Sequence, residues 1–333
     1  MSTRSLAGVS AAALVLTLAA CGGGGDGGGG EATDGATSPG EPGAVLTEVT
    51  IGTQPIVDSA PLYLGREQGL FEAEGIDLVI ESAAGGAVVI PSVVSGEYDF
   101  GRGNLLSTMI AVDQGLDLQC IANANSTAGD PDFGAVVVLA DSPIQGIADL
   151  PGNSVSVNTL ANIGDTTIRS VVEEAGGDPS GIEFVEVPFP DAPATLASGQ
   201  VDAAWILEPF LTVALDNGAR VLSYNFSDFH PELDISCVFA SAAKMESDPE
   251  LVERFRRAMN TSLEYSQEHP DEVRDIVGTY TEIDPAVLER IVLPVFRTDF
   301  SREAAEKLGR EATKYGTLQA EPDLDRLLPE GPA

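Results

Sequence analysis

The sequence predicts an α/β fold of two lobes, each with a mainly parallel sheet flanked by helices. Three observations support this prediction. Strand-like and helix-like segments alternate along the chain from about residue 47 onward, which is the pattern of parallel strands connected by helices. A short phrase occurs twice, as VSGEYDFGRGN at 94–104 and as ASGQVDAAWILEPF at 197–210. A chain of 333 residues is also long enough for two lobes of ordinary size.

The strands are expected where short apolar runs are bounded by glycines and polar residues. In lobe 1 these runs are 48–53, 76–82, 98–103 and 118–124, and in lobe 2 they are 154–159, 182–189, 201–207 and 219–225. Helices are expected to begin near Ser59, Gly85, Asn104, Ile163, Ala192 and Pro209. Residues 235–245 read as a strand crossing back to lobe 1, followed by helices from Ser247 and over 270–280, 284–293 and about 301–315.

The domain boundaries follow from this order of elements. The apolar faces of the C-terminal helices are expected to pack on lobe 1, so lobe 2 is an insertion reached by two crossings. The predicted boundaries are 47–128 and 235–330 for lobe 1, 135–228 for lobe 2, and 129–134 and 229–234 for the hinge crossings.

The repeated phrase is interpreted as scaffold. In each copy Ser-Gly ends a helix and the next residues begin a strand, so Gly96 is expected to adopt the left-handed conformation. The chemistry is expected in the residues at the far end of each strand: Asn104 after the first copy, and Trp205 with Glu208 after the second.

Composition excludes several classes of protein. With 17 basic and 52 acidic residues the formal net charge is −35, which argues against a basic surface for nucleic acid or anionic membranes. The only histidines, His230 and His269, each precede a proline, and the sequence has no metal-binding, nucleotide-binding or nucleophile signature. We therefore expect a protein that is not an enzyme and that has no metal or cofactor.

The N-terminus predicts export. Residues 1–20 carry one early charge, Arg4, and then an apolar stretch typical of a secretory signal. Leu-Ala-Ala-Cys resembles the bacterial lipobox, in which Cys21 becomes the lipidated first residue; the alternative is an ordinary signal with an incidental cysteine. The glycine-rich stretch 21–46 is expected to be a flexible tether. The protein is thus expected to be lipid-anchored at the outer face of the bacterial cytoplasmic membrane.

Two further cysteines, Cys120 and Cys237, lie in short apolar runs that read as strands. Outside the cytoplasm such a pair can form a disulfide. Two buried free thiols are an equally good interpretation, because cysteine is often a small core residue.

Loops rich in small and polar residues follow several predicted strands. In open parallel sheets, ligands bind beyond the carboxyl ends of the strands. Several of these loops lead directly into helices, whose free backbone N–H groups and positive dipole end suit an anionic group. The segments VPFPDAP and AAWILEP would add Phe189, Trp205 and Phe210 as apolar walls.

Five segments together resemble the nitrate/sulfonate/taurine and thiamine-pyrimidine group of ABC-transporter substrate-binding proteins. They are IGTQPIVDSAPLYLGREQGLFEAEGIDLVIE, VVSGEYDFGRGN, DSPIQGIADLPGNSVSVNT, LASGQVDAAWILEPF and HPDEV, and the resemblance covers 47 to about 320. It implies a type II periplasmic-binding fold, whose two lobes close on a small molecule in the cleft between them. It also implies delivery to a membrane permease driven by an ATPase, by a protein expected to be a monomer.

The residues expected to bind the ligand combine the loops that this resemblance indicates with one apolar wall. They are Gln54, Asp58, Ser59, Ala60, Gly85, Gly86, Asn104, Asn125, Ser126, Thr127, Asn158, Thr159, Asn162, Phe189, Trp205 and Glu208. None of these loops contains lysine, and only Arg102 beside Asn104 is basic.

The sequence ranks an organic anion, either a sulfonate or an aromatic carboxylate, as the first candidate solute. The alternative is a pyrimidine or another heteroaromatic vitamin precursor, stacked on Trp205 and bonded by Glu208. A sensory or adhesion lipoprotein and an enzyme of the same fold are the remaining classes.

Overall fold

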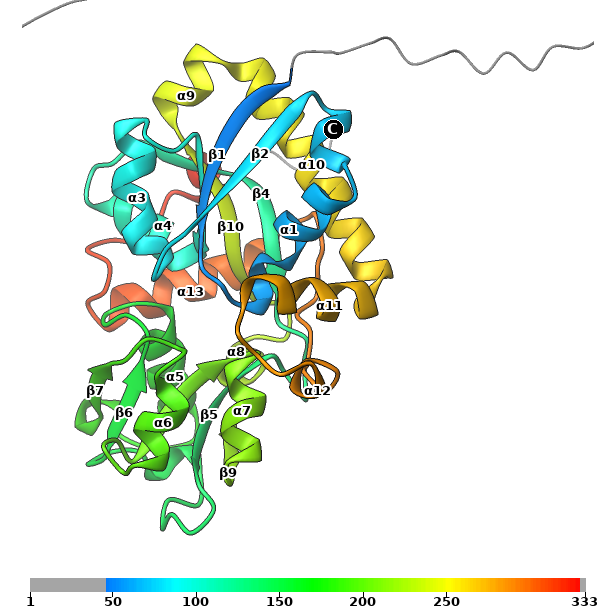
Figure 1. The fold of residues 1–333 in the computed structure, drawn as a ribbon. Coiled ribbons are helices and arrows are strands. Elements are labelled where there is room, and N and C mark those ends of the chain that lie inside the picture. Colours follow the sequence, from blue (N-terminus) through cyan, green and yellow to red (C-terminus); the bar gives the residue numbers. More distant parts are fainter. Residues whose placement is uncertain (1–45, 330–333) are drawn as a thin grey trace, which may run out of the picture. The chain divides into compact units, whose positions relative to one another are not determined.

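Two five-stranded sheets organise the part of the chain that the structure, a computed structural model, describes, residues 46–329 (Figure 1). The expected signal peptide, Cys21 and residues 22–45 of the expected tether lie outside the described residues. We call the first sheet with its helices lobe 1 and the second sheet with its helices lobe 2.

The two sheets have the same topology, since the strands of each sheet take corresponding places in the strand order. In lobe 1 the order is β2-β1-β3-β10-β4, formed by β1 (Thr47–Thr53), β2 (Ile76–Ser82), β3 (Phe100–Asn104), β4 (Leu118–Ser126) and β10 (Asp234–Ser241). In lobe 2 it is β7-β6-β8-β5-β9, formed by β5 (Gly134–Leu139), β6 (Ser154–Val157), β7 (Glu183–Glu186), β8 (Ala203–Leu207) and β9 (Ala219–Ser223).

Each sheet is mixed, with four strands running in one direction, as the prediction of mainly parallel sheets requires, and one strand running against them. Strand β1 is parallel to β2 and β3, whereas β10 is antiparallel to β3 and β4. Likewise β6 is parallel to β7 and β8, whereas β5 is antiparallel to β8 and β9. The antiparallel strand is in each case the one that follows a crossing from the other lobe. Because it enters from the opposite direction, it runs against its neighbours.

Helices cover the sheets (Figure 1). Those of lobe 1 are α1 (Ala60–Glu67), α2 (Leu70–Ala73), α3 (Gly86–Ser95), α4 (Leu105–Asp113), α9 (Ala242–Ser247), α10 (Pro249–Glu268), α11 (Pro270–Tyr280), α12 (Pro285–Leu288), α13 (Arg302–Lys314) and α14 (Leu324–Leu327). Those of lobe 2 are α5 (Ile163–Glu174), α6 (Ala192–Ala197), α7 (Phe210–Asp216) and α8 (Asn225–Phe229). Short 3-10 turns lie at Val57–Ser59, Ile147–Asp149 and Pro179–Gly181. None of the helices within 46–329 has the length and apolarity needed to cross a membrane.

The sequence pattern explains the longest helix. The Asp248 side chain accepts a hydrogen bond from the Leu251 backbone N–H and so caps α10. The buried face of α10, which includes Leu251, Phe255 and Leu263, packs on α1 and β4. The helix expected over 284–293 is shorter, ending at Leu288. The segment beyond it is held by lobe 2 and β4, because the Val292 N–H donates to Glu208 and Val295 pairs with Ser126.

The repeated phrase has the same structural task in both lobes. Gly96 and Gly199 have φ values of 78° and 68°, which confirms the left-handed turn expected at Gly96. The Asp99 carboxylate accepts from the Thr50 N–H at 2.9 Å, and Asp202 accepts from the Ser154 N–H at 2.8 Å. The backbone N–H of each aspartate donates back to the carbonyl oxygen of the same partner. The phrase therefore ties β3 to β1 in lobe 1 and β8 to β6 in lobe 2.

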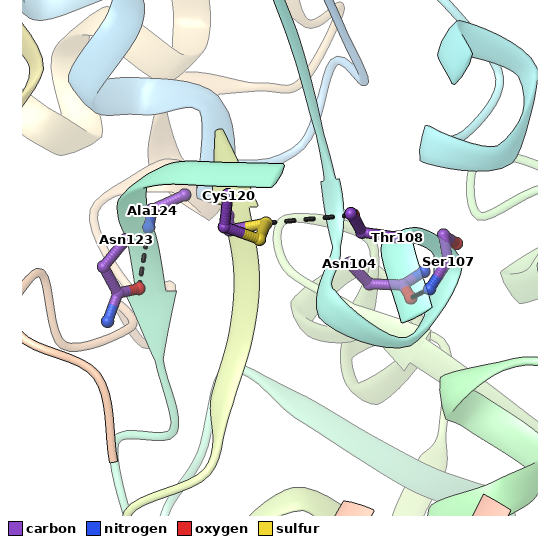
Figure 2. The surroundings of a disulfide bond; sticks show 7 residues. Asn104, Ser107, Thr108, Cys120, Asn123 and Ala124 are labelled. Atoms are coloured by element: carbon purple, nitrogen blue, oxygen red, sulfur yellow. Dashed lines mark hydrogen bonds between the residues drawn. A yellow bond between two sulfur atoms is a disulfide. The ribbon is translucent and has the colours of Figure 1, made fainter. Parts of the chain in front are cut away.

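A disulfide joins Cys120 on β4 to Cys237 on β10, so the pairing is the correct one of the two interpretations that the sequence leaves open. Both cysteines are fully buried. Figure 2 shows Thr108 of α4 beside this bond, with its hydroxyl 3.8 Å from Cys237 Sγ. The bond spans 117 residues and holds the strand that returns from lobe 2 against the strand that leads toward it.

Removal of the carboxylate in Asp202→Ala should lower the free energy of unfolding by about 1–2 kcal/mol at neutral pH, because the Ser154 N–H loses a charged acceptor. Hydrogen bonds from the Ser154 backbone and hydroxyl lower the pKa of Asp202. The Asp202 carboxylate therefore contributes to the free energy of unfolding at pH values above its pKa in the unfolded state. This contribution is lost as the pH falls through the lower pKa of Asp202 in the folded state. Urea unfolding at pH 7 and at pH 3 measures both effects. Asp202→Asn, which keeps one acceptor oxygen, should lose less, and equal stability of Asp202→Ala and the unmodified protein at pH 7 would contradict the assignment.

Candidate functional site

A narrow, partly open gap lies between the two lobes and is lined by both of them. Its cavity volume in this structure is about 10 Å³, room for about one water. The lining residues from lobe 1 are Gln54, Ile56, Asp58, Arg102, Asn104, Ile235 and Ser236, and those from lobe 2 are Asn158, Ile163, Phe189, Trp205, Leu207 and Phe226. We call this space the interlobe gap. A wider outer groove of about 320 Å³ shares Gln54, Ile56 and Phe189 with it and has an otherwise mostly apolar lining.

Six of the residues that the sequence predicts for binding line the interlobe gap: Gln54, Asp58, Asn104, Asn158, Phe189 and Trp205. Three more predicted residues, Gly85, Thr159 and Asn162, lie at its edge, where the lobes approach each other. A Cβ added at Gly85 would lie 3.7 Å from Thr159 Oγ1. Asn162 begins α5 and hydrogen-bonds across the lobes with the Ser107 hydroxyl of α4.

The other predicted residues lie behind this lining. Ser59 donates to the Gln54 carbonyl oxygen at 2.6 Å, and Asn125 donates to Asp58 Oδ2 at 3.0 Å, so both position lining residues. Ala60 is buried at the start of α1. A Cβ at Gly86 would lie 2.6 Å from the Gly103 Cα, so this glycine permits close packing of α3 on β3.

Two predicted residues, Ser126 and Thr127, take part in the first crossing. The Ser126 hydroxyl donates to Asp234 at 2.6 Å, and the Thr127 hydroxyl donates to Asp132. Asp234 also accepts from Arg297 at 2.7 Å. These contacts hold the two crossings and the C-terminal segment together and do not reach the interlobe gap.

The charge in the interlobe gap comes from one ion pair. Arg102 on β3 and Asp58 in the turn after β1 lie 2.8 Å apart, and both side chains are 1% exposed. The same guanidinium nitrogen donates to Asn125 Oδ1 at 3.2 Å and to the Ser236 hydroxyl at 2.7 Å. Burial raises the pKa of Asp58, and the Arg102 charge acts in the opposite direction. The lining is therefore polar without a net charge.

Trp205 is both buried and part of the lining. Its side chain is 2% exposed, and it packs edge to face against Phe189 and Phe226 with ring centroids 5.2 and 5.5 Å away. A Cβ at Gly164 would lie 2.6 Å from the indole ring, so only glycine allows α5 to approach it this closely. The indole Nε1–H has no hydrogen-bond partner among the described residues. A buried donor of this kind is suited to a ligand acceptor.

Glu208 is outside the lining of the interlobe gap. Its carboxylate accepts from the Thr212 backbone N–H at 3.0 Å, from the Thr212 hydroxyl at 2.7 Å and from the Val292 N–H at 3.3 Å. Its backbone carbonyl oxygen accepts from the Val57 N–H of lobe 1 at 3.2 Å. Glu208 thus connects α7 of lobe 2 with two segments of lobe 1. Burial raises its pKa to about 7.

Several lining residues escape sequence reasoning. Phe226 and Ser236 lie in or beside the second crossing, where no motif marks them. Arg102 gives a signal, because it is an isolated charge in a strand of small residues, but its partner lies 44 residues earlier in the chain. No group of three or more His, Cys, Asp or Glu side chains within the described range is placed to hold a metal ion.

The stability of the protein should depend on the protonation of Glu208. Because its folded pKa, about 7, is above the ordinary value of 4.5, the folded state binds the proton more tightly than the unfolded state. Stability should then fall by about 3 kcal/mol as the pH rises from 4.5 to 7. Glu208→Gln should remove this part of the pH profile, measured by urea unfolding.

A second variant tests the raised pKa of Glu208 by removing one of its hydrogen-bond donors. Thr212→Val keeps the backbone donor and removes the hydroxyl donor to Glu208. It should raise the pKa of Glu208 further, so the fall in stability should extend to higher pH. Identical pH profiles for the unmodified protein and Glu208→Gln would contradict the assignment.

The chain matches known proteins across most of its length. The family model described as NMT1/THI5 like matches residues 56–273. A formylaminopyrimidine-binding protein from Halalkalibacterium halodurans is 26% identical over 235 residues, which cover 70% of this chain and 69% of that protein. A 4-amino-5-hydroxymethyl-2-methylpyrimidine phosphate synthase from Schizosaccharomyces pombe is 21% identical over 240 residues, covering 67% of this chain and 64% of the synthase.

The solved structures identify the fold. The periplasmic aliphatic sulphonate binding protein SsuA from Escherichia coli superimposes with a TM-score of 0.70 at 18% identity, covering 84% of this chain and 96% of that chain. This likeness confirms the type II periplasmic-binding fold, with its two mixed sheets. The chain belongs to the NMT1/THI5-like family of substrate-binding proteins.

Proposed function

We propose that this chain is the solute-binding protein of an ABC importer, which captures a small organic solute between its lobes and delivers it to a permease driven by an ATPase. The observation that carries the proposal is the interlobe gap, because both lobes contribute polar and aromatic groups to the lining of one narrow space. A site divided between two lobes is complete only when the lobes are together, so solute binding and lobe closure are coupled.

Contacts between the lobes away from the gap support this coupling. Arg290 of lobe 1 pairs with Asp216 of α7 at 2.6 Å, and Lys307 of α13 pairs with Glu174 of α5 at 2.9 Å. Helix α13 packs against both α4 and α5, next to the boundary between the lobes in Figure 1. We propose that the hinge crossings at 129–134 and 229–234 allow lobe 135–228 to move relative to 47–128 and 235–330.

The anchor completes the proposed role. We propose that residues 1–20 direct export, that Cys21 is lipidated, and that residues 21–46 tether the lobes to the outer face of the membrane. An extracytoplasmic location is consistent with the buried disulfide between Cys120 and Cys237. The binding protein is proposed to act as a monomer.

The charge of the site favours a neutral heteroaromatic solute of the aminopyrimidine type over the organic anion that the sequence ranks first. Arg102 is the only cation lining the interlobe gap, and Asp58 neutralises it. Phe189 and Trp205 both line the gap and offer aromatic contacts for a planar ring. One observation favours an anion as the second candidate, because Arg102 Nε has no partner among residues 46–329.

A binding role fits the positions of the histidines better than the synthase activity of the yeast relative. His230 accepts from the Glu232 backbone N–H, and His269 stacks on Tyr265 with ring centroids 3.9 Å apart. Neither ring lines the interlobe gap, so neither is placed to exchange a proton with a solute there.

A thermal-shift screen of the tether-free protein tests the proposed function. The probes are 4-aminopyrimidines, alkyl and aryl sulfonates, and aromatic carboxylates. A solute at a hundredfold excess over its dissociation constant should stabilise the folded state by about 2.7 kcal/mol. We expect a shift with aminopyrimidines. A shift with sulfonates alone would favour the second candidate, and no shift with any class would contradict the proposed function.

Substitution of Trp205 tests whether the interlobe gap is the binding site. Trp205→Phe keeps an aromatic ring and removes the Nε1–H, so the affinity for the bound solute should fall about 2–10-fold by calorimetry. Because Trp205 is the only tryptophan of the chain, the intrinsic fluorescence of the unmodified protein should change on binding. Phe239→Leu, in the core of lobe 1 outside the gap, is the control for a general loss of packing. Unchanged affinity in Trp205→Phe together with unchanged fluorescence would place the solute elsewhere.

A further inference from the structure

The ion pair between Asp58 and Arg102 has free hydrogen-bonding capacity inside the interlobe gap. One guanidinium nitrogen of Arg102 donates to Asp58 Oδ2, to Asn125 Oδ1 and to the Ser236 hydroxyl. Asp58 Oδ2 also accepts from Asn125 Nδ2 at 3.0 Å. The other carboxylate oxygen, Asp58 Oδ1, is buried and has no hydrogen-bond partner within 46–329.

This arrangement determines what the ion pair offers to a solute. Asp58 takes the charge of Arg102, and the other N–H of the same nitrogen is shared between Asn125 and Ser236. Nη1 donates to the Ser59 hydroxyl at 3.4 Å, which leaves Nε as the guanidinium nitrogen without a partner within 46–329. A carboxylate oxygen without a partner accepts hydrogen bonds only, since an ionised carboxylate has no proton to donate. Leaving such an atom unpaired in a buried site is costly, and a second negative charge beside it would be more costly still.

Other charges do not alter this balance. Of the residues that line the interlobe gap, all of them described, only Asp58 and Arg102 are charged. Glu208, the nearest acidic side chain of the sequence-predicted site outside the lining, directs its carboxylate to Thr212 and Val292. The charge that a solute meets in the gap is therefore decided by one aspartate and one arginine.

We infer that Asp58 is the residue that selects the charge of the solute: it neutralises Arg102, excludes anions, and presents Oδ1 to an N–H group of a neutral or cationic solute. The inference rests on the proposed function for the location of the solute. It goes further by assigning the selection to a single residue, whose neutralisation would convert the gap into an anion site centred on Arg102.

The experiment compares Asp58→Asn with the unmodified protein by calorimetry, using 4-aminopyrimidine and benzenesulfonate as probes. The unmodified protein should prefer the aminopyrimidine. In Asp58→Asn the uncompensated Arg102 should raise the affinity for benzenesulfonate at least tenfold, and the affinity for the aminopyrimidine should fall.

Asp234→Asn is the matched control. Asp234 is also 1% exposed and forms an ion pair with an arginine, Arg297, at 2.7 Å, but it lies outside the interlobe gap. Its substitution should cost stability, measured by urea unfolding, and leave the ratio of the two affinities unchanged. A change of that ratio in Asp234→Asn as large as in Asp58→Asn would overturn the inference.

A second variant keeps the inference testable if Asp58→Asn does not fold, because an unpaired buried arginine is destabilising. In the double variant Asp58→Asn with Arg102→Gln both charges are absent, so the preference for aminopyrimidine over sulfonate should fall toward one. An unchanged preference would overturn the inference.

If the unmodified protein binds neither probe, the proposed solute is wrong, whereas a gain of sulfonate binding in Asp58→Asn alone would still support the role of Asp58. No gain there would contradict it.

Discussion

The insertion of one antiparallel strand into the middle of each sheet is the constraint on which the rest of the structure depends. Strand β5 lies between β8 and β9, and β10 lies between β3 and β4. Each belongs to a segment that has just crossed from the other lobe, so each crossing ends in an interior strand of a sheet rather than in an edge strand. The disulfide on β10 fixes one of these insertions covalently. The interlobe gap lies between sheets that are joined in this way, and Ile235 and Ser236 of β10 line it.

Much of the fold could be predicted because the signals are local. The capping aspartate of α10, the glycine turn at Gly96 and most strand positions follow from residues that are neighbours in sequence. The strand Gly134–Leu139 could not be predicted as the one antiparallel strand of lobe 2, because a continuous apolar run does not reveal the direction in which a strand runs.

The candidate site could be predicted in its loops and less well in its contacts. Gln54 and Asn158 follow strands, Asn104 ends one, and all three line the gap. The orientation of Glu208 depends on Val292, which is 84 residues away, and the neutralisation of Arg102 depends on Asp58, 44 residues away. Such pairings are tertiary, and no spacing in the sequence encodes them. The sequence can therefore place a charged residue beside the cleft without showing whether its side chain faces the solute or the rest of the protein.

The paired aspartates of the repeated phrase have a consequence for how such a protein can change its specificity. Asp99 and Asp202 fasten the start of β3 and of β8 to a neighbouring strand, whereas Asn104, the last residue of β3, and Trp205, the middle residue of β8, line the gap. In each lobe, the anchoring residue and the lining residue are therefore different residues. Substitutions at the lining residues leave these two aspartate anchors in place, so one framework can be adapted to solutes of different chemistry, and each lobe can contribute such changes.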